Sequence, residues 1–161
     1  LIAAGLWFLL TPKVDLRFAS FRERVSGLAL RGYQMSKVST NLEEIHAFLD
    51  QRKWPADYVL PKGLEKLPPE GCANLEWHNQ KYSMVCFDAG KNRDGKPKEL
   101  YLLVAPRAEL RDVPAADKPQ FVATHDPGIM TATWVAGKNV YILVGNLLVG
   151  NRESDLTQYL E

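Results

Sequence analysis

The 161-residue chain contains little cysteine and almost no net charge. Its two cysteines, Cys72 and Cys86, are too few for a disulfide scaffold and lack the spacing of a zinc site. Twenty basic residues against nineteen acidic ones leave a formal net charge of +1, so no long-range positive field would attract nucleic acid. We therefore do not expect nucleic acid as a partner.

Motifs for catalysis and cofactor binding are also missing. The sequence has no G-x-G-x-x-G or Walker phosphate-binding pattern and no G-x-S-x-G nucleophile elbow. Glu43 and His46 have the spacing of two metal ligands on one helix face, but no second such pair completes a site. Of the remaining histidines, His78 falls in an expected tight turn, and His125 stands at the end of an expected strand, just before a Pro127-Gly128 loop. We expect no catalytic, metal-binding or cofactor-binding residue, and a protein that is not an enzyme.

What the chain does have is an opening run, LIAAGLWFLL, without any charged or polar side chain. As a helix this run would be about 15 Å long, half of a hydrocarbon core of about 30 Å. It predicts that residues 1–12 are the C-terminal part of a transmembrane helix, with membrane lipid as a partner. A buried core helix and the end of an uncleaved signal peptide are the alternatives. The expected anchor residues are Leu1, Ile2, Leu6, Trp7, Phe8, Leu9 and Leu10.

Two helices are expected after this run. Residues 13–40 are interpreted as a juxtamembrane helix, which Asp15 can cap, followed by a polar linker. A clearer helix is expected from residue 42 to Trp54, with Thr40 or Asn41 as its N-cap.

Residues 41–161 are expected to form one extracytoplasmic domain. Alternating apolar residues separated by short turns predict antiparallel strands in most of it. The expected fold class is α+β, a mainly antiparallel sheet of about five to six strands with flanking helices, preceded by the partial transmembrane helix. The expected strands cover residues 73–77, 82–87, 99–104, 121–125, 129–135 and 140–144.

The two cysteines fall on neighbouring expected strands, and the loop between the strands decides their relation. A three-residue loop would let Cys72 face Cys86, so that a disulfide could form in an oxidising compartment. A two-residue turn would instead place Cys86 on one face of the sheet with Tyr82 and Met84, and Cys72 on the other. Both arrangements remain open, and two buried free thiols are the alternative to the disulfide.

Four segments carry a family resemblance: GCANLEWHNQKYSMVCFD, LYLLVAPRAEL, FVATHDPGIMTATWVAGKNVYILVG and the closing LTQYL. The chain resembles a family of uncharacterised single-pass bacterial membrane proteins that are similar to transmembrane anti-sigma factors. The positions that match the family pattern are Gly71, Cys72, Trp77, Cys86, Phe87, Thr131, Ala132, Trp134, Gly137, Tyr141, Leu143 and Gly145. The inserted segment NLLVGNRE departs from that pattern.

The resemblance implies a single-pass protein of the bacterial inner membrane with a periplasmic C-terminal domain, whereas the basic residues just after the opening run favour the cytoplasmic side. We expect a non-enzymatic protein-interaction domain, an anti-sigma-factor-like sensor or regulator that contacts another membrane or periplasmic protein. An accessory structural subunit of a larger membrane complex is one alternative, and a periplasmic hydrolase or redox enzyme is another. Trp77, Trp134 and Tyr141 are expected as docking or core aromatics.

Overall fold

The computed structural model describes residues 15–126, 129–146 and 156–161. The expected membrane anchor, residues 1–12, lies outside these described residues. Within them, none of the helices combines the length and the apolar character that crossing a bilayer requires.

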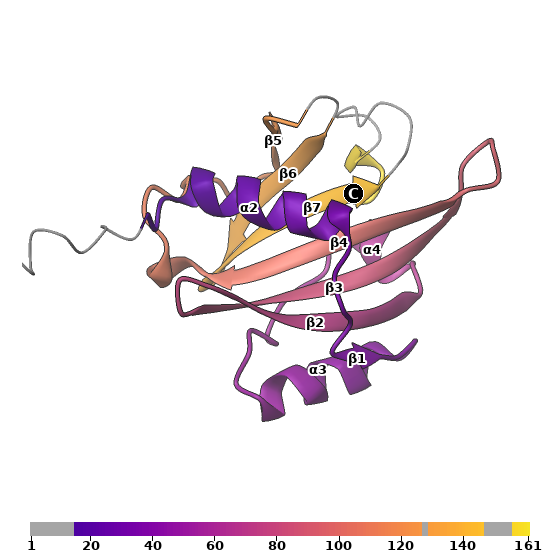
Figure 1. Cartoon of the computed structure of the whole chain (residues 1–161), viewed down its shortest axis with the longest axis horizontal. Coiled ribbons are helices and arrows are strands. Elements are labelled where there is room, and N and C mark those ends of the chain that lie inside the picture. The colour runs from indigo at the N-terminus through magenta and orange to yellow at the C-terminus, as the bar shows by residue number, and fades with distance from the viewer. Residues whose placement is uncertain (1–14, 127–128, 147–155) are drawn as a thin grey trace, which may run out of the picture.

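Seven strands form a single antiparallel sheet in the order β1-β2-β3-β4-β7-β6-β5 (Figure 1). The strands are β1 (Lys37–Val38), β2 (Pro69–Trp77), β3 (Gln80–Lys91), β4 (Pro97–Pro106), β5 (Gln120–Ala123), β6 (Met130–Ala136) and β7 (Asn139–Asn146). The α+β class is confirmed, but the strand number of five to six is wrong. The additional strand is β1, which lies in the expected linker and pairs with β2 through Lys37 opposite Cys72.

The helices named among the described residues are α2 (Phe18–Arg31), α3 (Leu42–Gln51), α4 (Lys62–Glu65) and the short 3-10 helix η1 (Arg107–Glu109). Asn41 is the N-cap of α3, as expected, and its side chain accepts a hydrogen bond from the Glu43 amide at 2.9 Å. Asp15 does not cap α2, because the helix begins three residues later and Arg17 is the N-cap. The Asp15 carboxylate instead accepts hydrogen bonds from Arg17 and from Ser20 Oγ.

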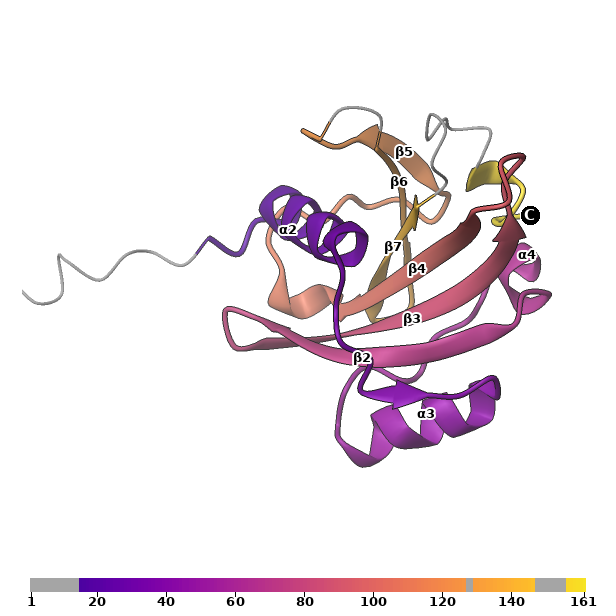
Figure 2. The same ribbon diagram turned by 45° about the vertical axis from the view of Figure 1, so that its right-hand side comes forward.

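Helices cover both faces of the sheet, which therefore has two apolar cores (Figure 2). On the α2 face, Phe18, Phe21, Val25 and Ala29 of α2 pack against side chains that include Met84, Cys86, Leu103 and Ile142. On the α3 face, Ile45 and Leu49 of α3, Leu64 of α4 and Leu156 pack against side chains that include Val85, Phe87, Leu102 and Leu143. Because successive strand residues point to opposite faces, every long strand contributes to both cores.

Candidate functional site

Two of the three aromatic residues expected as docking or core groups lie inside the α3-face core. Trp134 and Tyr141 are opposite each other on β6 and β7, and their rings stack with centroids 5.2 Å apart. Only 6% of Trp134 and 1% of Tyr141 is exposed, so both residues pack the fold. Trp77 is partly buried on the α2 face, where its ring centroid lies 5.4 Å from that of Phe21.

The two cysteines are free and lie on opposite faces of the sheet. The turn between β2 and β3 has two residues, His78 and Asn79, both with positive φ, so Trp77 pairs with Gln80 and Cys72 pairs with Val85. This register directs the two thiols away from each other, and the disulfide considered from the sequence is not formed. Burial raises the pKa of Cys72 to about 11 and that of Cys86 to about 12, so both thiols stay protonated at neutral pH.

The candidate metal pair on α3 has no third ligand: the described residues contain no group of three or more His, Cys, Asp or Glu side chains that could hold a metal ion. His46 instead packs edge-on against Tyr58 with ring centroids 4.5 Å apart. Burial lowers the pKa of His46. His125 is mostly exposed, and its Nδ1 lies 3.3 Å from Glu23 Oε2 on α2.

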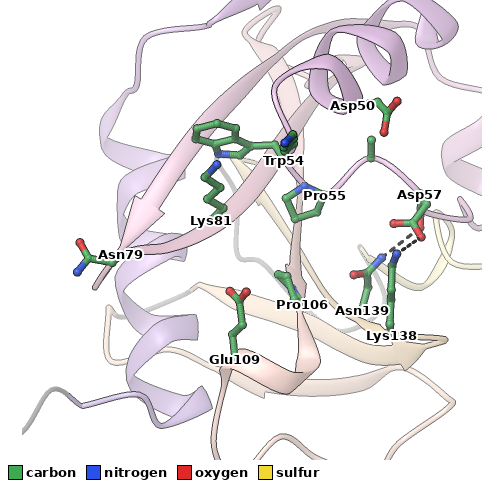
Figure 3. A pocket seen from close by; sticks show the side chains of 12 residues that line it. Asp50, Trp54, Pro55, Asp57, Asn79, Lys81, Pro106, Glu109, Lys138 and Asn139 are labelled. Carbon is green, nitrogen blue, oxygen red and sulfur yellow. Dashed lines mark hydrogen bonds and ion pairs between the residues drawn. The ribbon is translucent and has the colours of Figure 1, made fainter.

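A pocket of about 760 Å³ opens on the α3 face at one end of the sheet (Figure 3). It lies where β2 ends, β3 begins, β4 ends and β7 begins, because antiparallel neighbours bring these strand ends together. The lining residues are Asp50, Lys53, Trp54, Pro55, Ala56, Asp57, Asn79, Lys81, Pro106, Glu109, Lys138 and Asn139. A second hollow of about 350 Å³ lies next to it, since the two share Asp50, Ala56 and Asp57 in their linings.

The loop that follows α3 forms one wall of the pocket and is fixed to three strands. It reverses direction at Lys53, whose φ is 57°. Its hydrogen bonds run from Trp54 Nε1 to the Leu75 carbonyl of β2 (3.3 Å), from Ser83 Oγ of β3 to the Pro55 carbonyl (2.7 Å), and from Asn139 Nδ2 of β7 to the Asp57 carbonyl (3.1 Å). These contacts fix this wall of the pocket to the sheet.

The charged side chains around the pocket differ in their partners. The lining holds three acidic side chains and three lysines. Lys138 Nζ lies 2.8 Å from Asp57 Oδ2, and this hydrogen bond lowers the pKa of Asp57. Lys81 Nζ lies 4.1 Å from the centre of the Trp54 ring, in a cation–π contact.

Glu109, like Asp50, has no ion pair among the described residues. Its Oε2 is buried and has no hydrogen-bond donor among the described residues. Burial raises the pKa of this carboxyl group, since the charged form loses solvation.

Sequence reasoning did not find this pocket. Its residues come from four segments between positions 50 and 139, and each segment alone has the composition of an ordinary turn. One local indication was the sequence KWPAD, in which a tryptophan stands directly before a proline at a helix end.

Comparison with known proteins gives no match, since no family model, no curated protein sequence and no solved structure is similar enough to this chain. The resemblance to single-pass membrane proteins of the anti-sigma type stays a prediction.

Proposed function

We propose that this chain is a non-enzymatic protein-interaction domain that binds its partner at the pocket on the α3 face. The observation that carries the proposal is a pocket whose wall is held by hydrogen bonds and which is built from loops and the adjoining ends of helices and strands in four segments of the chain. Segments of this kind, supported by a rigid sheet, are the usual place for binding residues. The proposed role is that of a sensor or regulator at a membrane.

A protein partner accounts for the surroundings of the pocket better than a small metabolite does. Charged side chains of both signs form much of its lining, around Trp54 and two prolines. A buried aromatic anchor inside a polar rim is typical of protein interfaces.

The membrane part of the proposal is supported by the run LIAAGLWFLL and by the family resemblance. Residues 1–12 would hold the domain at a bacterial inner membrane, and the domain would lie in the periplasm. Protease added to spheroplasts of a bacterial host that expresses the chain should then digest the folded domain before the cells are lysed. Digestion only after lysis would contradict the periplasmic location.

Site-specific photocrosslinking in the native host tests the interaction. The crosslinking amino acid is placed at Asn79 or Lys53, which are exposed at the pocket, and at Arg93, which is exposed in the loop at the other end of β3 and β4. We expect the same partner protein to be crosslinked from both pocket positions and not from Arg93. Crosslinks from Arg93 alone, or none from the pocket, would contradict the proposal.

The same experiment separates the regulator from the accessory subunit. A crosslinked partner that also co-purifies stably as part of an integral membrane complex would assign the accessory role. A partner whose crosslink yield changes with growth conditions would assign the regulatory role, because a sensor must change its occupancy.

A further inference from the structure

Glu109 is held rigidly at the pocket by the backbone on both sides of η1. The Arg107 amide donates to the Lys138 carbonyl in the β6–β7 turn at 2.8 Å. The Arg111 amide donates to the Leu16 carbonyl before α2 at 2.9 Å. Figure 3 shows the Glu109 side chain extending from η1 into the pocket. The backbone that carries Glu109 is therefore fixed beside the pocket.

Glu109 lines the pocket and forms no ion pair among the described residues, so a cationic ligand would meet a carboxylate that has no competing partner. The strongest donors for a carboxylate are cationic, namely the guanidinium of arginine and the ammonium of lysine. The pocket also offers apolar surface from Trp54, Pro55, Ala56 and Pro106. Such surface suits the methylene groups of a long basic side chain.

An anionic ligand fits the pocket less well. Lys138 is paired with Asp57, and Lys81 lies over the Trp54 ring, so two of the three lysines already have favourable contacts. An anion would also have to approach the Glu109 carboxylate, which would repel it. The charge arrangement therefore favours a cation.

We infer that the pocket receives an arginine or lysine side chain of the partner protein, and that the Glu109 carboxylate binds its cationic group. This inference rests on the proposed protein-interaction function. The volume of about 760 Å³ exceeds what one side chain fills, so residues flanking the basic one also enter the pocket.

The test is an NMR titration of the 161-residue chain with end-blocked tripeptides Ala-Arg-Ala, Ala-Lys-Ala, Ala-Glu-Ala and Ala-Ala-Ala. The Trp54 indole N–H reports on the pocket, and its resonance is assigned with Trp54→Phe. We expect the arginine and lysine peptides to shift this resonance saturably, and the alanine and glutamate peptides to leave it in place. Stronger binding of the glutamate peptide would overturn the inference.

Glu109→Gln separates the carboxylate from the shape of the pocket. We expect it to weaken binding of the arginine peptide about tenfold or more, because a charge-assisted hydrogen bond is lost. The matched control is Glu65→Gln, at an exposed position on α4 outside the pocket lining, which should not change the affinity. Equal affinities of Glu109→Gln and the unmodified chain would overturn the inference.

Failure of this inference can be told apart from failure of the proposed function. Crosslinks at Asn79 and Lys53 that persist in Glu109→Gln, without binding of the arginine peptide, would support the proposed interaction function. They would contradict the inference that a basic side chain binds in the pocket. Binding of the arginine peptide without any crosslinked partner would show that the pocket accepts a basic side chain, and it would contradict the proposed interaction function.

Discussion

The two faces of the sheet are covered in different ways. On the α2 face, one helix of 14 residues supplies a continuous apolar stripe, and Phe21 and Val25 are essentially inaccessible to solvent. Residues outside α2, including Tyr33, Met35 and Leu110, complete the cover of this face. On the α3 face, the cover consists of α3, the loop after it, α4 and the C-terminal residues 156–160. A single helix buries its stripe without interruption, whereas several short pieces end at different places. The pocket lies on the α3 face, whose cover of several short segments we call the divided cover. Gaps between such segments leave room for a binding site.

The largest expected losses of stability come from truncating one large buried side chain on each face of the sheet. Phe21→Ala should lower the free energy of unfolding by about 3–5 kcal/mol, and Leu49→Ala by about 2–5 kcal/mol, because each leaves a cavity in a closed core. The free cysteines report which face opens, since Cys86 lies in the α2-face core and Cys72 in the α3-face core. Under native conditions a thiol reagent should label Cys86 faster in Phe21→Ala and Cys72 faster in Leu49→Ala.

Single-cysteine backgrounds, Cys72→Ala and Cys86→Ala, assign the labelled thiol, and urea titration gives the stability. Equal acceleration at both thiols in each variant would mean that the two faces open together. The faces would then form one cooperative unit, and the comparison between them would not extend to their dynamics.

Replacing a helical glycine by alanine should change the free energy of unfolding by a smaller amount, with opposite signs on the two faces. A Cβ on Gly63 of α4 would lie 2.6 Å from the Tyr159 backbone, which cannot move aside without shifting the C-terminal segment. Gly63→Ala should therefore lower the free energy of unfolding by about 1–3 kcal/mol. A Cβ on Gly27 of α2 would meet only the end of the flexible Arg31 side chain.

Gly27→Ala is thus the matched control, and it should raise the free energy of unfolding by up to about 1 kcal/mol, because alanine favours the helix interior. Thermal and urea unfolding of the two variants measure the difference. Destabilisation by Gly27→Ala of the same size as that by Gly63→Ala would show that α2 is packed as tightly as the divided cover.

The sheet could largely be predicted from the sequence, because its long strands alternate apolar and polar residues or run through β-branched and aromatic clusters. β1 could not, since Lys37 and Val38 lie in a polar run without any alternation. They form a strand only because they pair with residues of β2. Gly71 permits that approach, since a Cβ there would collide with the Lys37 carbonyl oxygen.

The pocket could not be predicted, because it depends on which strand ends meet. Lys81, Glu109 and Lys138 come together only once β7 is known to lie beside β4. Local pattern gives each strand but not the order of strands. The hairpin aromatics illustrate the same point: Trp134 and Tyr141 could have faced solvent or core until the α3-face cover was placed over them.

The smallest expected change in the free energy of unfolding comes from replacing Glu109, which lines the pocket on the α3 face. Burial raises the pKa of Glu109 in the folded chain above its value in the unfolded chain. Between these two values the folded state binds more protons than the unfolded state, so the free energy of unfolding contributed by this group falls as pH rises through that window. At neutral pH the ionised carboxylate therefore destabilises the fold.

Glu109→Gln removes this penalty while keeping the side-chain shape. We expect it to match the unmodified chain below the unfolded-state pKa, where both side chains are neutral, and to be more stable above the folded-state pKa. The gain should stay below about 1 kcal/mol, because the side chain is only partly buried and solvent screens its charge. Urea unfolding at a series of pH values from acidic to neutral measures it. A gain that does not grow with pH would show that the carboxylate carries no folding cost. A gain that accompanies weaker binding of the arginine peptide would mean that the residue reduces stability where it serves binding, a trade-off typical of functional sites.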